Sequence, residues 1–274
     1  MGGVLTAGPP PAPPSCGVGS PRTHQAAVAV SLPMKKAETG LPLLQLWGKV
    51  QTMNGSDYLV ALGSWGAHMF EGKIVAKPVY FYCQDGMNWA DLTISDVSEE
   101  QAARCAKLTS VLSGEPSTVY TVEEPAPAPE GEPAEPAEGE EAPPAPEPVT
   151  VEVTELERLK TMISSISLVS GIVPKGALVL DAGNNITFNR TFSGIPYPDK
   201  LDSYIHSWEG PDGSSLATDP KGSWAVKSDD ISGQTTLCSL VYPGFAFYYS
   251  SVHKTWGGLY VGTGVKNTDL LFLL

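Results

Sequence analysis

A low-complexity segment near the middle of the chain places the strongest limit on how this sequence can fold. Residues 123–148 contain only Glu, Pro, Ala and Gly, with nine glutamates and nine prolines. Proline lacks a backbone donor and the glutamates repel one another, so the segment cannot build a core and is expected to be an extended, solvated loop. The remaining sequence is thereby divided into two candidate folded blocks, one on each side of this acidic loop.

The net charge of the chain is concentrated around the same segment. No Lys or Arg occurs between Lys107 and Arg158, whereas this stretch holds 13 of the 30 acidic residues. The other 17 acids balance the 17 Lys and Arg, so this stretch accounts for the whole net charge of −13. A nucleic-acid partner is not expected, because phosphate binding requires a basic patch. Two interpretations of the acidic loop stay open, a passive surface insertion and a contact for a basic protein surface.

The N-terminal region differs in composition from the rest of the chain. Residues 1–36 are rich in Pro, Gly, Ala and Ser, contain no acidic residue, and are expected to be disordered. Their first six residues fit the pattern for myristoylation of Gly2, with a transit peptide or a misassigned start as alternatives. Neither a secretory signal nor a membrane span is expected, because no sufficiently long apolar run occurs. The cysteines form no CxxC pair, which favours free thiols in a reducing compartment.

The first folded block is expected to be mainly β-structure. Alternating residues in Leu44–Val50 and the run Asp57–Leu62 flank Asn54-Gly55, a strong signal for a type I′ hairpin turn. A further β-like run extends over Ile74–Cys83. Ser98-Glu-Glu-Gln101 has the pattern of a capping box and predicts a helix that continues to Leu112.

The second block begins with a helix and continues with short strands. Thr154-Glu-Leu-Glu157 is a second capping box, before a helix that should end near Gly171. Strand and turn patterns follow from Val173, including a predicted strand over Ile186–Phe192. The predicted fold class is α+β, β-rich, with mostly antiparallel sheets and a few helices. We expect a disordered N-terminal extension at 1–36, a β-rich lobe with a helix at 37–113, the acidic loop at 114–150, and a helix followed by a β-rich lobe at 151–274.

No pattern in the sequence indicates catalysis. The four histidines lack metal-ligand spacing, and no GxSxG nucleophile elbow occurs. The glycine-rich stretch 257–264 lacks the Gly-Lys-Ser/Thr ending of a phosphate loop, so tight turns explain it better. We therefore predict no catalytic, cofactor-binding or metal-binding residue, and no enzyme.

Several longer motifs together are similar to the radial spoke head protein 9 family of ciliary and flagellar axonemes. They are Leu46-Trp-Gly-Lys-Val50, Val173-Pro-Lys-Gly-Ala-Leu178, Asn189-Arg-Thr-Phe-Ser-Gly194, Pro220-Lys-Gly-Ser-Trp224 and Tyr260-Val-Gly-Thr-Gly-Val-Lys-Asn-Thr-Asp-Leu270. The resemblance implies a non-catalytic structural subunit of the radial spoke head, located in the cytoplasm and the axoneme, which supports mechanical signalling between the central apparatus and dynein arms. It also implies radial spoke head proteins of the 4 and 6 type as partners, and central-apparatus projections as further contacts. Family members usually begin with a helix, which the Pro/Gly-rich start of this chain does not predict.

Two segments are expected to dock partner proteins. An apolar C-terminus left in water would be unfavourable, so the tail is one candidate, and the motif after Ile186 is the other. The predicted interface residues are Asn189, Arg190, Thr191, Phe192, Leu270, Leu271, Phe272, Leu273 and Leu274. The alternative functions are a generic β-rich protein-binding scaffold outside cilia and, given a deep pocket with clustered titratable groups, a small-molecule enzyme.

Overall fold

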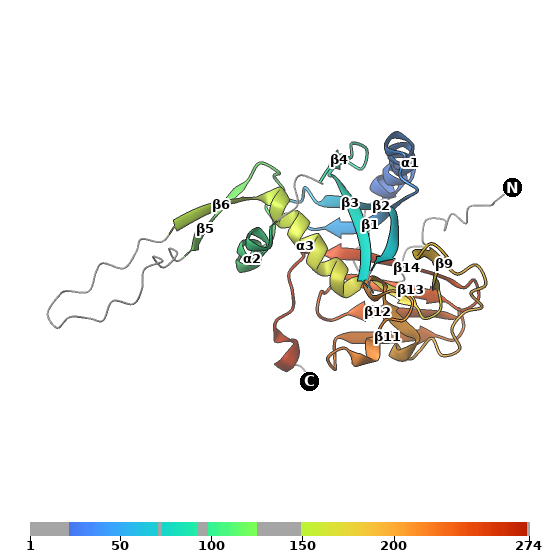
Figure 1. The fold of residues 1–274 in the computed structure, drawn as a ribbon. Coiled ribbons are helices and arrows are strands. Elements are labelled where there is room, and N and C mark those ends of the chain that lie inside the picture. The colour runs from blue at the N-terminus through green and yellow to red at the C-terminus, as the bar shows by residue number, and fades with distance from the viewer. Residues whose placement is uncertain (1–21, 71–72, 93–97, 125–148, 273–274) are drawn as a thin grey trace.

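The computed structural model describes residues 22–70, 73–92, 98–124 and 149–272. In these ranges a large, mostly antiparallel sheet carries helices on its two faces, which confirms the predicted β-rich α+β class (Figure 1). The α-helices are α1 (Arg22–Thr39), α2 (Glu99–Lys107) and α3 (Glu155–Ser170), and the short 3₁₀ helices are η1 (Leu201–Ser203), η2 (Ser207–Glu209), η3 (Leu216–Thr218) and η4 (Asp269–Phe272). None of the helices in the described ranges is long and apolar enough to cross a membrane.

The strands are β1 (Leu43–Val50), β2 (Tyr58–Phe70), β3 (Lys73–Cys83), β4 (Ala90–Asp91), β5 (Val119–Glu124), β6 (Val149–Thr154), β7 (Ile172–Pro174), β8 (Leu178–Leu180), β9 (Asn185–Phe188), β10 (Tyr204–His206), β11 (Trp224–Asp229), β12 (Gln234–Ser239), β13 (Phe245–Ser250) and β14 (Thr255–Gly262). The main sheet has the order β11-β12-β13-β14-β1-β2-β3-β4, with β9 paired to β2 and β8 paired to β9. Two small sheets pair β7 with β10 and β5 with β6.

One parallel pair, β1 with β14, unites the two predicted lobes in a single sheet. Gly48 lies opposite Tyr260 in this pair, and a Cβ atom at Gly48 would lie 2.3 Å from the Tyr260 carbonyl oxygen. The strands can therefore approach this closely only because residue 48 has no side chain. The lobes predicted at 37–113 and 151–274 are therefore parts of one hydrogen-bonded sheet.

Helix α3 covers one face of the main sheet. Its apolar residues recur at helical spacing, and Leu159, Ile163 and Ile166 are fully buried. They share a core with sheet residues such as Phe247 and Tyr260. Burial of each such side chain contributes roughly 1.5–3 kcal/mol. The capping boxes predicted before α2 and α3 are both present.

Helix α1 covers part of the other face and corrects the prediction for the N-terminal region. Residues 22–36 were expected to be disordered, but they are helical, and Val28 and Leu32 pack in a cluster with Leu59 and Phe81 of the sheet. The Pro and Gly that suggested disorder lie almost entirely before residue 22, whereas α1 contains no Gly and a single Pro. The expected disorder of residues 1–21 lies outside the described residues.

Strands β5 and β6 form a two-stranded ribbon, here called the arm, that projects from the main sheet (Figure 1). The arm corrects the boundaries of the acidic loop, which was expected to span 114–150. Tyr120 and Val122 of β5 pair with Val153 and Val151 of β6, and Val122 and Val153 pack on Cys105 of α2. Residues 125–148 lie outside the described residues.

Candidate partner-docking site

The predicted docking residues Asn189–Phe192 form a turn after β9. A strand had been predicted over Ile186–Phe192, but pairing ends at Phe188. The side chain of Asn189 explains the difference, because its Oδ1 accepts hydrogen bonds from the backbone N (3.0 Å) and Oγ1 (2.7 Å) of Thr191. The Asn189 Nδ2 atom donates to the Gly176 carbonyl at 2.9 Å. Asn189 and Thr191 therefore shape the turn and fasten it to the turn before β8.

Three aromatic rings meet beside this turn, and they are named here the aromatic cluster: Phe188, Phe192 and Trp256. The Trp256 ring on β14 lies 5.3 Å from the Phe192 ring and 6.1 Å from the Phe188 ring. Phe192 is half-buried, whereas Phe188 is 60% exposed. Contacts between ring edges and faces favour this arrangement and hold the rings in place. The turn thus presents a preformed aromatic surface to solvent.

The second predicted docking segment begins with the short helix η4. The preceding chain is fastened by Asn267, whose backbone N donates to the Val241 carbonyl and whose Nδ2 donates to the Leu240 carbonyl. Leu270 is half-buried, Leu271 and Phe272 complete η4, and Leu273 and Leu274 lie outside the described residues. The C-terminal end of the described chain lies apart from β9, which leads into the Asn189–Phe192 turn, so the structure does not combine the two predicted segments into one site (Figure 1).

The root of the arm contains a buried carboxylate that sequence reasoning missed. The Glu155 side chain is fully buried and accepts hydrogen bonds from the Tyr58 and Tyr120 hydroxyls, both at 2.7 Å. It also accepts from the backbone N of Gly114 (2.8 Å) and from the backbone N and Oγ of Ser113. Burial opposes ionisation, but hydrogen bonds from Ser113, the tyrosines and Gly114 outweigh it and lower the pKa of Glu155. In the sequence, Glu155 lies four residues before Leu159 and therefore falls on the apolar stripe of α3. A carboxylate at this position indicates a buried charge, and this was the signal that could have identified the site.

Arg158 complements Glu155 one helical turn later. Its guanidinium is buried, lies 4.7 Å from the Tyr120 ring centroid, and donates through Nη2 to the carbonyls of Leu108 and Ser110. These contacts help end α2 at Lys107, short of the predicted Leu112. Both residues hold the loop between α2 and β5. Glu155 accepts hydrogen bonds from backbone and hydroxyl donors of this loop, and Arg158 donates to its carbonyl groups, so together they fix the arm on α3.

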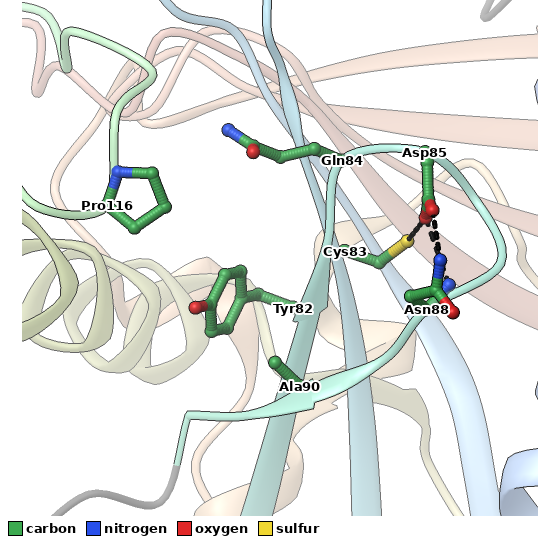
Figure 2. Close-up of a pocket in the computed structure, with 7 residues that line it drawn as sticks. All are labelled: Tyr82, Cys83, Gln84, Asp85, Asn88, Ala90 and Pro116. Carbon is green, nitrogen blue, oxygen red and sulfur yellow. Dashed lines mark hydrogen bonds between the residues drawn. The ribbon is translucent and has the colours of Figure 1, made fainter.

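A cavity of about 300 Å³ lies between the β3–β4 turn and the loop at the root of the arm (Figure 2). Its most polar group, the Asp85 carboxylate, accepts hydrogen bonds from Met87, Asn88 and the Cys83 thiol. Burial and the neighbouring Asp85 raise the pKa of Cys83 to about 11, so this thiol is protonated at neutral pH. Asp85 and Cys83 therefore serve the turn and do not form an activated nucleophile.

Within the described residues, no group of three or more His, Cys, Asp and Glu side chains is arranged to hold a metal ion. The polar clusters at Glu155 and Asp85 are each satisfied by donors of the chain itself. The aromatic cluster, in contrast, is an exposed apolar surface beside the predicted docking residue Phe192.

The chain is similar over nearly its whole length to proteins named radial spoke head protein 9 homolog. The Mus musculus and Homo sapiens proteins are each 28% identical, with 94% of both chains covered. The Xenopus tropicalis protein is 26% identical, with 91% of both chains covered. No family model matches the chain. The similarity confirms the resemblance to the radial spoke head protein 9 family that the sequence motifs indicate.

Proposed function

We propose that this chain is a subunit of the radial spoke head in ciliary and flagellar axonemes. The observation that carries this proposal is the similarity to radial spoke head protein 9 homologs, which covers 94% of both chains in the Mus musculus comparison. A match of this extent includes both sides of the acidic segment and is therefore not limited to one shared module. The proposal places the chain in the axoneme.

The role within the head is structural and non-catalytic, supporting mechanical signalling between the central apparatus and dynein arms. A part that transmits contact needs a stiff body. Continuity of the main sheet through the β1–β14 pair supports this role, as does the aromatic core beneath α3. Around the cavity at Cys83, Asp85 is occupied by donors of its own turn and Gln84 by the carbonyls of Ser56 and Gly114, which favours a structural role over catalysis.

Its partners are other radial spoke head proteins, of the 4 and 6 type, and central-apparatus projections. We assign the docking to two surfaces, the turn Asn189–Phe192 with its aromatic cluster and the tail Leu270–Leu274. The half-buried Leu270 and the exposed Phe188 support this assignment, because a partner would remove apolar surface from water at both places.

Salt extraction of isolated axonemes tests the proposal. We expect the tagged chain to enter the same extract as the head proteins and to co-purify with them. Deleting residues 270–274 should abolish that co-purification without preventing expression. Met34→Ser is the matched control, because Met34 is 65% exposed on α1, which lies apart from β9 and from the C-terminal end of the chain (Figure 1). Absence of the intact chain from axonemes would overturn the assignment, and normal assembly of the truncated chain would overturn the role of the tail.

A further inference from the structure

Three cationic residues lie on the segments that carry or adjoin the aromatic cluster. Arg190 lies within the turn between Phe188 and Phe192, and its side chain is exposed. Lys254 lies on the β13–β14 turn, and a Cβ atom at Gly194 would be 3.7 Å from the Lys254 Cγ atom. Lys175, also exposed, precedes Gly176, whose carbonyl accepts the hydrogen bond from Asn189. The aromatic cluster and these cations form one continuous feature, here called the basic aromatic surface.

An excess of cations over acidic residues makes this surface unusual for the chain. The segments that build it, residues 173–181, 186–199 and 251–261, contain the cations Lys175, Arg190 and Lys254, and their acidic residues are Asp181 and Asp199, at the ends of the first two segments. The whole chain has 30 acidic residues and a net charge of −13. Cationic side chains beside exposed aromatic rings favour a ligand that combines negative charge with apolar groups.

The chain itself contains a segment with that chemistry. Residues 123–148 hold nine glutamates, nine prolines and no cation. Proline-rich peptides dock on aromatic surfaces because their extended conformation loses little entropy on binding. Carboxylates pair with Arg and Lys through charge-assisted hydrogen bonds. Both components of the segment thus have a counterpart on the basic aromatic surface.

The ends of this segment indicate which copy of the chain supplies it. Residues 125–148 of this segment connect Glu124 at the end of β5 to Val149 at the start of β6, and the arm leads away from β9 (Figure 1). An arm that points away from the surface in its own molecule can present its tip to a second molecule. We propose that the basic aromatic surface binds the acidic segment 123–148 of a second copy of this chain.

Two copies can make this contact reciprocally, since each carries one surface and one segment. A reciprocal pair would have twofold symmetry, and the second contact would form at a high effective concentration. The proposal rests on the docking role assigned to the Asn189–Phe192 turn but names a second copy of this chain, and not a spoke head protein, as its occupant, so it does not require the radial spoke assignment.

Fluorescence anisotropy with a labelled peptide of residues 123–148 and the purified full chain tests the contact. We expect binding that weakens as salt rises, because exposed charges are screened within roughly 8 Å at physiological ionic strength. The double variant Arg190→Glu/Lys254→Glu should bind about tenfold more weakly or worse, since two attractive pairs become repulsive. Lys227→Glu, which reverses an exposed lysine on β11, is the matched control and should bind as the wild type does.

A peptide with all nine glutamates replaced by glutamine should not bind. Sedimentation velocity of the full chain should show a salt-sensitive dimer that the double variant lacks, with circular dichroism verifying that the variant is folded. Equal affinity for the acidic and the glutamine peptides, or for the wild type and the double variant, would overturn the proposal. The experiment contains no spoke protein, so its failure leaves the axoneme test unaffected.

Discussion

Helix α3 supports two neighbouring regions, the main sheet and the arm, by different kinds of contact. Over the main sheet, its buried residues are apolar, as at Leu159, Ile163 and Ile166. At the root of the arm, its buried residues are charged, and Glu155 and Arg158 bind a loop through hydrogen bonds. Apolar burial stabilises without fixing direction, whereas hydrogen bonds are directional. The comparison suggests that the apolar turns of α3 provide stability and that its first turn provides the orientation of the arm.

Replacing Glu155 with alanine is expected to have the largest effect. The Tyr58 and Tyr120 hydroxyls and the Gly114 backbone N would lose their acceptor, and each buried donor left unpaired costs about 1–3 kcal/mol. We expect a total loss of roughly 3–4 kcal/mol in urea unfolding, with faster hydrogen exchange first in β5 and β6. Glu152→Ala, on the exposed side of β6, should change neither quantity. Unchanged exchange in the arm would show that Glu155 does not determine its attachment.

Replacing Ile163 with alanine tests the apolar half of the comparison. Ile163 is fully buried, so its truncation leaves a cavity and should lower the free energy of unfolding by about 2–4 kcal/mol. Faster exchange is expected in β13, β14 and β1, with the arm affected only through global unfolding. Leu168→Ala is the control on the same helix, because Leu168 is 59% exposed. If Ile163→Ala loosens the arm more than the sheet, the division between the two regions fails.

Local signals in the sequence predicted local structure well in both regions. The capping boxes at Ser98 and Thr154 are formed as expected, because each depends on residues three positions apart. The Asn189 turn was misassigned, because Thr191 and Phe192 favour strands while one side-chain amide decides otherwise. The helix α1 was missed because a composition average over residues 1–36 mixed a Pro/Gly-rich part with a helical part.

Contacts between distant residues were beyond the reach of such signals. The β1–β14 pair joins Gly48 to Tyr260, and parallel strands so far apart leave no turn signature between them. The Glu155 site draws its donors from three separate segments, around Tyr58, Ser113 and Tyr120. Of the basic aromatic surface, the sequence indicated Arg190 and Phe192, whereas Trp256 and Lys254 join them only through the fold.

Replacing Gly48 with alanine sharpens the comparison within the main sheet. The added Cβ would lie 2.3 Å from the Tyr260 carbonyl oxygen, so β1 and β14 must separate. Such overpacking typically costs about 1–3 kcal/mol. We expect a loss in this range, with exchange accelerated in β1 and β14 and the arm unchanged. Gln45→Ala, at an exposed position of β1, should stay within about 0.5 kcal/mol of the wild type. A fully stable Gly48→Ala chain would mean that the parallel pair does not need this close approach.

The smallest expected difference between the two regions lies in how their contributions to the free energy of unfolding change at acidic pH. Folding lowers the pKa of Glu155 below its ordinary value of 4.5, so the unfolded chain binds this proton more readily than the folded chain does. The ionised Glu155 carboxylate therefore stabilises the folded chain above pH 4.5. This stabilisation is lost as the pH falls through the folded-state pKa of Glu155. In Glu155→Gln this titration is absent, so the stability difference between wild type and variant should narrow as the solution is acidified below 4.5.

Urea unfolding of both chains over an acidic pH series measures this difference. Ile163→Ala provides the contrast, because its deficit relative to the wild type involves no titrating group and should stay constant with pH. If the loss of unfolding free energy in Glu155→Gln is also independent of pH, the buried acceptor is not an ionised carboxylate. In that case the arm would be held by neutral hydrogen bonds, and the contrast between a charged joint and an apolar core would reduce to one between polar and apolar contacts.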